Sequence, residues 1–166
     1  MSLMGLDLSC TATGIAVLAD DGAVLALDRV GRKLTRAATV RDKVERLMHI
    51  ADRVLRVRDQ FDVRTIAVEN YAFHARGAQN DLAELHGVVK MQLWLRNQIE
   101  VRLVHASAAR KAVLGVGRIE KADIVRVVRA RGVAVADDNQ ADAWVVAEWL
   151  RLEEDAHAGA RDNGKE

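Results

Sequence analysis

The stretch LMGLDLSCTATGIAVLADDGAVLALDRV, residues 3–30, contains three short apolar runs that predict three β-strands. Runs of four to eight aliphatic residues bounded by turn residues are typical of buried strands. Asp20, Asp21 and Gly22 separate the second run from the third, and an Asp-Gly pair is a strong signal for a tight hairpin. The chain is therefore expected to begin with an antiparallel meander.

Beyond this meander, helical and strand patterns alternate. Apolar residues recur every three or four positions in several segments, which predicts amphipathic helices over residues 39–58, 80–98, 107–114, 121–131 and 139–154. RTIAVEN (64–70) lies between the first and second of these helices and VRLVHA (101–106) between the second and third, and both predict strands. Gly115 and Gly132 are expected to end two of the helices. The order β-β-β-α-β-α-β-α-α-α predicts an α/β fold with a mixed five-stranded sheet flanked by helices in three layers.

Length and composition favour one domain. A chain of 166 residues with 50% hydrophobic content buries one substantial core, which we expect to span residues 1–154. Residues 155–166 lose the apolar periodicity and are expected to form a disordered tail. Lys and Arg number 25 against 24 acidic residues, so a nucleic-acid surface would have to arise from local segregation of charge.

The compartment is expected to be the reducing cytoplasm. Cys10 is the single cysteine, which excludes an internal disulfide. Neither a signal-peptide pattern nor a run of about 18 apolar residues is present, so no membrane partner is expected.

Four carboxylates lie at the ends of separate apolar segments. Asp7 and Glu69 end two predicted strands, and Asp138 and Asp142 begin the last predicted helix. An unpaired buried charge costs several kcal/mol, and a bound divalent cation would compensate a group of such charges. Hard oxygen ligands suit Mg²⁺ or Mn²⁺, and two such ions about 4 Å apart are able to drive phosphodiester hydrolysis. The alternative for Glu69 is an ordinary residue at a strand end, and for Asp138 a helix cap.

Several segments together resemble one known family. GLDLSCTATGIAVL (5–18), IAVEN (66–70), SAARKAVLGVGRIEKADIV (107–125) and DNQADAWVVAEWL (138–150) are similar, in that order, to the RuvC family of Holliday-junction resolvases. This family belongs to the ribonuclease-H-like superfamily, and the short, arginine-rich chain resembles the bacteriophage or actinobacterial type. The resemblance implies the cytoplasm of a bacterial cell, or of a host cell for a phage-encoded chain. The resemblance implies a homodimer that uses Mg²⁺ to cleave two opposed strands of a four-way DNA junction.

The resemblance also implies roles for the carboxylates. Asp7 would bridge two metal ions, Glu69 would hold one, and Asp142 with a partner at the start of the helix would hold the other. The family position for that partner falls on Asn139, one residue after Asp138. Because a carboxylate binds a hard cation more strongly than an amide does, Asp138 is favoured, and Asp137 is a further alternative.

Basic and aromatic residues near these acids are candidates for DNA contact. The resemblance places family lysines at Arg110 and Lys121, and Lys121 is assigned a catalytic role because a cation beside the scissile phosphate stabilises transition-state charge. The full predicted DNA-binding set is Tyr71, Phe73, Arg76, Arg110, Lys111, Arg118 and Lys121. Solvated helix faces are the alternative for the basic residues, and packing under a loop is the alternative for Tyr71 and Phe73.

The leading hypothesis is a dimeric, metal-dependent endonuclease that resolves branched DNA. One alternative is a ribonuclease-H-like nuclease acting on flaps or forks, and another is an inactive junction-binding module. The helix over residues 80–98 is the expected dimer surface by resemblance, with Leu82, Leu85, Val89 and Leu93 either at that surface or in the core of the monomer.

Overall fold

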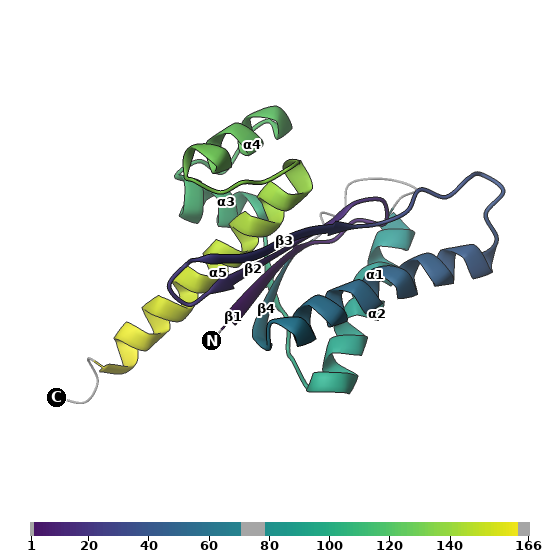
Figure 1. Cartoon of the computed structure of the whole chain (residues 1–166), viewed down its shortest axis with the longest axis horizontal. Helices are drawn as coiled ribbons and strands as arrows, with labels where there is room; N and C mark the ends of the chain where they lie inside the picture. Colours follow the sequence, from purple (N-terminus) through teal and green to yellow (C-terminus); the bar gives the residue numbers. More distant parts are fainter. Residues whose placement is uncertain (1, 71–78, 163–166) are drawn as a thin grey trace.

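The computed structural model describes residues 2–70 and 79–162. Its elements follow the predicted order (Figure 1). The strands are β1 (Ser2–Asp7), β2 (Thr13–Ala19), β3 (Val24–Val30), β4 (Val63–Glu69) and β5 (Arg102–Val104). The helices are α1 (Val40–Gln60), α2 (Gln79–Asn97), α3 (Ala106–Leu114), α4 (Lys121–Ala130) and α5 (Asp138–Asp162). No helix of the described part is long and apolar enough to cross a bilayer.

The five strands form one mixed sheet in the order β3-β2-β1-β4-β5. Strands β1, β2 and β3 pair antiparallel, which confirms the predicted meander, and Gly22 has the positive φ that its tight turn requires. Strand β4 pairs parallel with β1, with Leu6 opposite Val68. Asp7 and Glu69 therefore end adjacent parallel strands at the same edge of the sheet.

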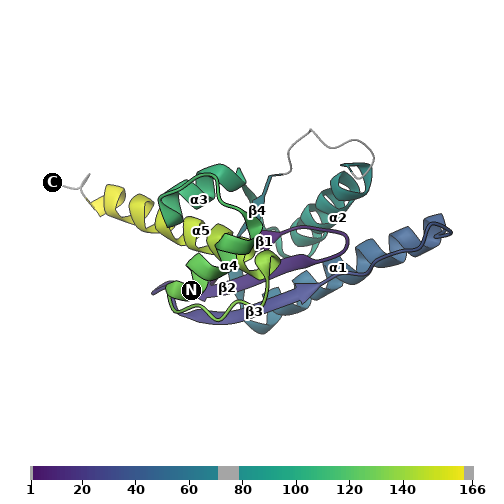
Figure 2. The same cartoon turned by 90° about the horizontal axis from the view of Figure 1, so that it is seen from above.

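Both faces of the sheet are buried. Side chains of a strand alternate between faces, so Leu6 and Ile15 point to one side, whereas Leu3 and Ala16 point to the other. Helices α1 and α2 cover the first face, and α3, α4 and α5 cover the second, which gives the predicted three layers (Figures 1 and 2). This arrangement explains why residues 3–6 of β1 and 66–68 of β4 are all apolar or glycine.

The structure corrects one expectation from the sequence and decides between two alternatives that the sequence left open. Residues 155–162 were expected to be disordered, but α5 continues through them to Asp162, and an ion pair between Arg151 and Asp155 supports the extra turns. The named apolar side chains of α2 belong to the core of the monomer rather than to a dimer surface: Leu85, Val89 and Leu93 are fully buried, and Leu82 packs against them.

Helix α5 lies unusually close to the sheet because two glycines face it. A Cβ atom added to Gly5 would collide with the backbone of Ala143 and Ala147, and one added to Gly14 would collide with the backbone of Asn139. Gly14 lies directly opposite Asp7 in the β1–β2 pairing. The absence of side chains at these two positions thus brings the start of α5 next to Asp7.

Replacing Gly5 by alanine is expected to destabilise the protein by about 1–3 kcal/mol or more, because the new methyl group would push against helix backbone that cannot yield locally. Urea unfolding followed by circular dichroism measures the change. Gly87→Ala is the matched control, since an added Cβ there meets nothing within 4 Å and alanine favours the helix. Equal stability of the two variants would contradict the proposed close packing.

Candidate active site

Four acidic residues from three elements meet near one edge of the sheet. Asp7 and Glu69 are partly buried at the ends of β1 and β4, and Asp142 is buried in the second turn of α5 with 7% exposure. Asp138 occupies the first position of α5 and is more accessible. The sheet pairing and the two glycines together determine this convergence of residues that are far apart in sequence.

Burial and mutual repulsion change the proton affinity of the three inner carboxyls. Burial, followed by repulsion from Glu69 and Asp142, raises the pKa of Asp7 to about 8. Burial, followed by repulsion from Asp142, raises the pKa of Glu69 to about 7. Burial also raises the pKa of Asp142, although the neighbouring Arg110 opposes that change. Carboxyls arranged in this way repel one another as anions, and a cation would relieve the repulsion.

Two basic side chains approach this acidic cluster from α3 and α4. The Arg110 guanidinium donates through Nε at 3.0 Å and through Nη2 at 2.7 Å to the same oxygen, Oδ1 of Asp142. The Lys121 ammonium donates to Oδ2 of Asp138 at 3.0 Å, and this hydrogen bond holds the pKa of Asp138 below its usual range. Lys121 is 84% exposed, so its ion pair adds little stability, whereas the Arg110–Asp142 pair is largely shielded from water.

The start of α5 also shows how its neighbouring polar residues are used. Oδ1 of Asp137 accepts a hydrogen bond from the backbone amide of Gln140, and Oδ2 pairs with Arg29 of β3 at 3.2 Å. Asp137 therefore caps the helix. The amide nitrogen of Asn139 is directed toward Asp138 at 3.4 Å. Of Asp138 and Asn139, only Asp138 has a carboxylate, and Lys121 donates a hydrogen bond to it.

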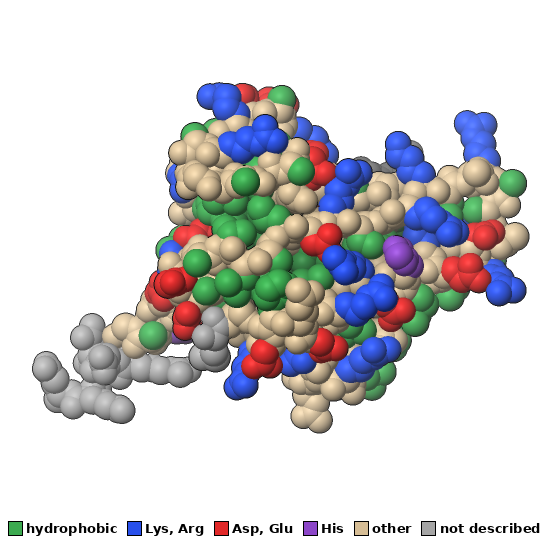
Figure 3. Space-filling view, viewed as in Figure 1, with side chains coloured by type: hydrophobic (Ala, Val, Ile, Leu, Met, Phe, Trp, Pro, Cys, Tyr) green, Lys and Arg blue, Asp and Glu red, His purple; other side chains and the backbone are tan. Residues whose placement is uncertain are grey.

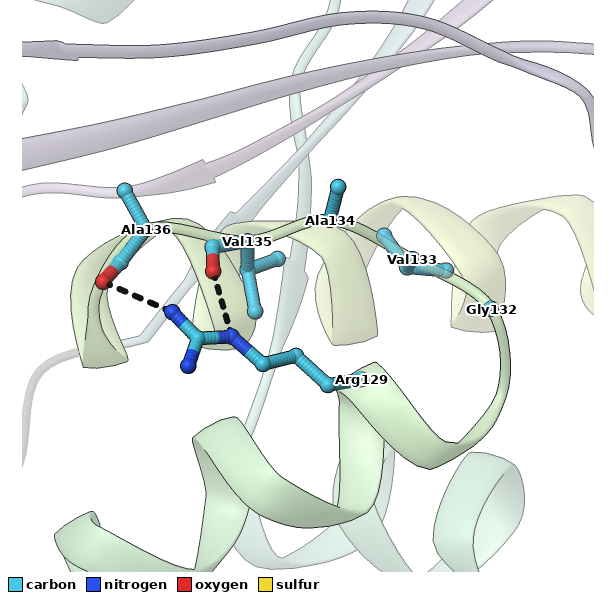
Figure 4. Close-up of a pocket in the computed structure, with 6 residues that line it drawn as sticks. All are labelled: Arg129, Gly132, Val133, Ala134, Val135 and Ala136. Atoms are coloured by element: carbon cyan, nitrogen blue, oxygen red, sulfur yellow. Dashed lines mark hydrogen bonds between the residues drawn. The ribbon is translucent and has the colours of Figure 1, made fainter.

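Hydrogen bonds from an exposed arginine hold the loop that leads into α5. The guanidinium of Arg129, near the end of α4, donates to the carbonyl oxygens of Val135 at 2.9 Å and Ala136 at 3.4 Å (Figure 4). Gly132, with a positive φ, lets the chain turn back so that it runs alongside this side chain (Figure 4). The contact links α4, which carries Lys121, to the loop that presents Asp138. Arg129 was not among the predicted site residues, because its partners are backbone carbonyl oxygens, which no residue pattern marks.

The donor set fits a hard divalent cation, although its side chains are engaged elsewhere. Within residues 2–70 and 79–162, no group of three or more His, Cys, Asp and Glu side chains is arranged as a ready set of metal ligands. Asp142 and Asp138 instead hold Arg110 and Lys121 as internal counter-ions. Carboxylate oxygens are nevertheless the kind of ligand that Mg²⁺ and Mn²⁺ prefer. Asp7, Glu69, Asp142 and Asp138 are the residues that would hold such ions.

The remaining predicted DNA-binding residues fall into two groups. Lys111 and Arg118 are exposed on the same side of the sheet as Arg110 and Lys121, in α3 and in the segment before α4. Tyr71, Phe73 and Arg76 lie outside the residues that the structure describes. Their assigned roles stay predictions.

Substituting Asp7 by asparagine is expected to stabilise the metal-free protein at alkaline pH. The pKa of Asp7 is about 8 in the folded protein, against an ordinary value of 3.8 that applies to the unfolded chain. The folded state therefore binds the proton more tightly, and the free energy of unfolding falls as the pH rises from the lower pKa to the higher one. Asparagine carries no charge to bury, and we expect a gain of about 1–3 kcal/mol at pH 9, with little gain at pH 4. Thermal unfolding of both proteins across this range measures it, and a pH-independent difference would contradict the burial of Asp7.

Such a mixed sheet, with carboxylates at the ends of its first and fourth strands and on the last helix, defines the ribonuclease-H-like class of α/β proteins. The model of the family described as crossover junction endodeoxyribonuclease RuvC matches residues 3–156. The chain therefore belongs to the RuvC family.

Solved structures agree with this fold. Thermus thermophilus RuvC matches with a TM-score of 0.73 and 24% identity, covering 96% of this chain and 97% of that one. The same protein in complex with a Holliday junction substrate matches with a TM-score of 0.74 and 24% identity over 92% of this chain and 96% of that one. The yeast mitochondrial Holliday junction resolvase Ydc2 has a TM-score of 0.59 and 11% identity, covering 92% and 80% of the two chains. No curated protein matches the sequence.

Proposed function

We propose that this chain cuts Holliday junctions by paired, symmetric nicks, using divalent metal ions, in DNA recombination and repair. One observation carries the proposal: Asp7, Glu69 and Asp142 are gathered and partly desolvated at one sheet edge, with Arg110 and Lys121 beside them, in a chain of the RuvC family. The Thermus thermophilus relative that has been solved with a Holliday junction substrate supports branched DNA as the partner.

Mg²⁺, with Mn²⁺ as a substitute, is the proposed cofactor, and two ions are proposed for each active site. When bound, such a pair lowers the pKa of a coordinated water and neutralises charge on the leaving oxygen. The protein itself would supply fixed carboxylates from the rigid ends of β1 and β4, which orient the ligands without further rearrangement. Asp142 would join them once Arg110 had released it.

Lys121 and Arg110 are proposed to bind the scissile phosphate. Electrostatic attraction connects Lys121 to Asp7, Asp142 and Asp138, so its ammonium lies close to the whole acidic cluster. Its exposed side chain is free to turn toward a phosphate in the same region. A cation in this position stabilises negative charge that develops in the transition state.

A second copy of the chain is the proposed partner of α2. Met91, Trp94 and Leu95 are exposed by 51%, 55% and 68%, and their spacing places them on one face of the helix. Two active sites related by a two-fold axis would address the two opposed strands of a symmetric junction. Helix α2 is also the dimer surface expected from the sequence. The residues proposed for the interface are now Met91, Trp94 and Leu95, because Leu85, Val89 and Leu93 are buried in the monomer.

Replacing Trp94 and Leu95 by serine is expected to convert the dimer to a monomer and to leave the fold unchanged, because both side chains lie outside the core. Light scattering coupled to gel filtration measures the mass. Cleavage of a junction by this variant should change from paired nicks to single, uncoupled nicks. A variant that kept the dimeric mass would show that another surface forms the interface.

A panel of DNA substrates tests the function as a whole. The protein is incubated with a four-way junction, a flap, a fork, a linear duplex and an RNA–DNA hybrid, in Mg²⁺ or in chelator, and the cut positions are mapped on every strand. The proposal predicts symmetric cuts in two opposed strands of the junction that require Mg²⁺. Preferential cutting of flaps, forks or hybrids would favour the broader nuclease alternative, and metal-independent binding without cutting would favour an inactive binding module.

A further inference from the structure

A strongly basic segment consists of the loop between β3 and α1 together with the first turn of α1, and none of its residues belongs to the predicted active site. Residues 31–43, here called the basic arm, contain Arg32, Lys33, Arg36, Arg41 and Lys43 but only one acidic residue, Asp42. All five basic residues are exposed. The arm projects at one end of the molecule in both orientations, at the right of the views (Figures 1 and 2). Several blue Lys and Arg side chains lie on that part of the surface (Figure 3).

Most of this charge is not used within the molecule. Arg41 pairs with Glu45, and Lys43 pairs with Asp81. Arg32, Lys33 and Arg36 form no side-chain hydrogen bond or ion pair among the residues that the structure describes. Asp42 attracts Arg32, but it is the only acidic residue of the arm and also accepts hydrogen bonds from Thr39. The clustering of Arg32, Lys33 and Arg36 therefore costs free energy that the fold recovers only in part. An external anionic partner would recover it.

The sheet topology directs this arm toward the active site. Val30, the last residue of β3, lies opposite Thr13, just beyond the Asp7–Gly14 pair. The arm therefore leaves the sheet at the same edge as Asp7 and Glu69. The backbone amide of Arg32 donates to the carbonyl of Cys10 at 3.3 Å, which attaches the base of the arm to the loop that follows Asp7.

A cavity continues the surface from this loop toward α1. It has a volume of about 270 Å³, and its polar lining consists of the side chains of Ser9, Thr11, Arg46 and Asp81. Arg46 is buried, and although its Nη2 binds Asp81 at 2.7 Å, its Nε has no acceptor within the described residues. Hydroxyls and a guanidinium beside the active-site loop are groups that bind phosphate oxygens.

The two basic surfaces lie on opposite sides of the acidic edge. Arg110 and Lys121 belong to α3 and α4, which cover one face of the sheet, whereas the basic arm leads into α1 on the other face. A DNA backbone that passes the carboxylates would meet positive charge on both sides. Phosphate contacts of this kind fix the position of DNA on a protein without reading its sequence.

We propose that the basic arm binds the phosphate backbone of one duplex arm of the branched DNA, several base pairs away from the cleaved bond. The inference rests on the proposed function and adds a second DNA contact surface to it. Its role is to hold a duplex arm in a fixed direction relative to Asp7 and Glu69, and so to contribute to recognition of the junction by shape.

The test compares two doubly substituted proteins of equal charge. The arm variant carries Lys33→Gln and Arg36→Gln. The control variant carries Arg56→Gln and Arg64→Gln, which remove two exposed charges near the end of α1 and the start of β4, at the opposite edge of the sheet. Affinity for a four-way junction is measured by fluorescence anisotropy, in chelator, over a series of salt concentrations. The logarithm of the binding constant falls linearly with the logarithm of the salt concentration, and each phosphate contact makes this slope steeper by about 0.9. The slope of the arm variant should therefore be shallower by about one to two units, and its affinity at 0.1 M salt should be roughly tenfold lower or more.

The expected result is a change in the arm variant alone, accompanied by loss of hydroxyl-radical protection on one duplex arm away from the cut sites. Equal changes in both variants would show that only the net charge of the protein matters, and would overturn the inference. An arm variant whose salt slope and footprint equal those of the wild type would also overturn it. A wild-type protein that bound no junction would overturn the proposed function as well. Because no metal and no cleavage are needed, failure of the arm is distinguishable from failure of the active site.

Discussion

Replacing Asp7 by asparagine is expected to lower the rate of junction cleavage by at least about 10³-fold, which corresponds to the several kcal/mol that a metal site contributes to phosphoryl transfer. Asp7 ends the central strand β1 and lies next to Glu69 of β4 in the parallel pairing. Asparagine keeps the shape of the side chain but removes the charge that would hold a cation. Junction binding should persist, because it depends on phosphate contacts made by basic residues elsewhere.

Single-turnover cleavage with the enzyme in excess measures this effect, and anisotropy in chelator measures binding separately. Asp28→Asn is a suitable control, since Asp28 is an acidic residue of β3 whose partner is Arg53, outside the acidic cluster. Retention of wild-type cleavage by the Asp7 variant would remove Asp7 from the active site. Loss of both binding and cleavage would instead indicate damage to the DNA surface.

The second large effect is expected at Arg110. Truncation to alanine should slow cleavage by about 10²–10³-fold, the usual loss when one charge-stabilising donor is removed. The same change should tighten binding of divalent cations to the DNA-free protein, because Oδ1 of Asp142 would no longer be occupied by the guanidinium. The two effects have opposite signs, which separates this role from general destabilisation.

Titration calorimetry with Mn²⁺ measures the cation affinity, and single-turnover kinetics measure the rate. Arg110→Lys should keep the charge and recover part of the rate, although lysine cannot reproduce the two-nitrogen contact. Arg151→Gln is the matched control: Arg151 is similarly shielded and also binds a carboxylate through two nitrogens, that of Glu148 further along α5. Unchanged cation affinity in the Arg110→Ala protein would refute the counter-ion role.

Periodicity and turn residues in the sequence were sufficient to predict the order and type of every element. Gly115 and Gly132 adopt the positive φ values expected after α3 and α4, and the meander follows from the Asp-Gly turn. Local patterns carry this information because strand and helix periods and glycine conformations are properties of neighbouring residues. The adjacency of Asp7 and Glu69 required one further fact, the parallel pairing of β1 with β4, which no local pattern contains.

The contacts that individual side chains make were harder to predict from the sequence. Leu85, Val89 and Leu93 form an apolar stripe on α2 that suits either a dimer or the monomer core, and only the packing against α1 and the sheet decides for the core. Arg110 and Asp142 are 32 residues apart, so their ion pair could not be derived from spacing. The basic arm is visible as a run of charges, but the edge of the sheet from which it leaves depends on the topology.

Anomalous diffraction from crystals of the protein grown with junction DNA and Mn²⁺ tests the central claim most directly. The account predicts two anomalous peaks for each active site, about 4 Å apart, with ligands drawn from Asp7, Glu69, Asp142 and Asp138. Asp142 should have released Arg110 in that complex. Crystals with bound junction whose Mn²⁺ peaks lie away from Asp7 and Glu69, or whose Asp142 still holds Arg110, would contradict the account.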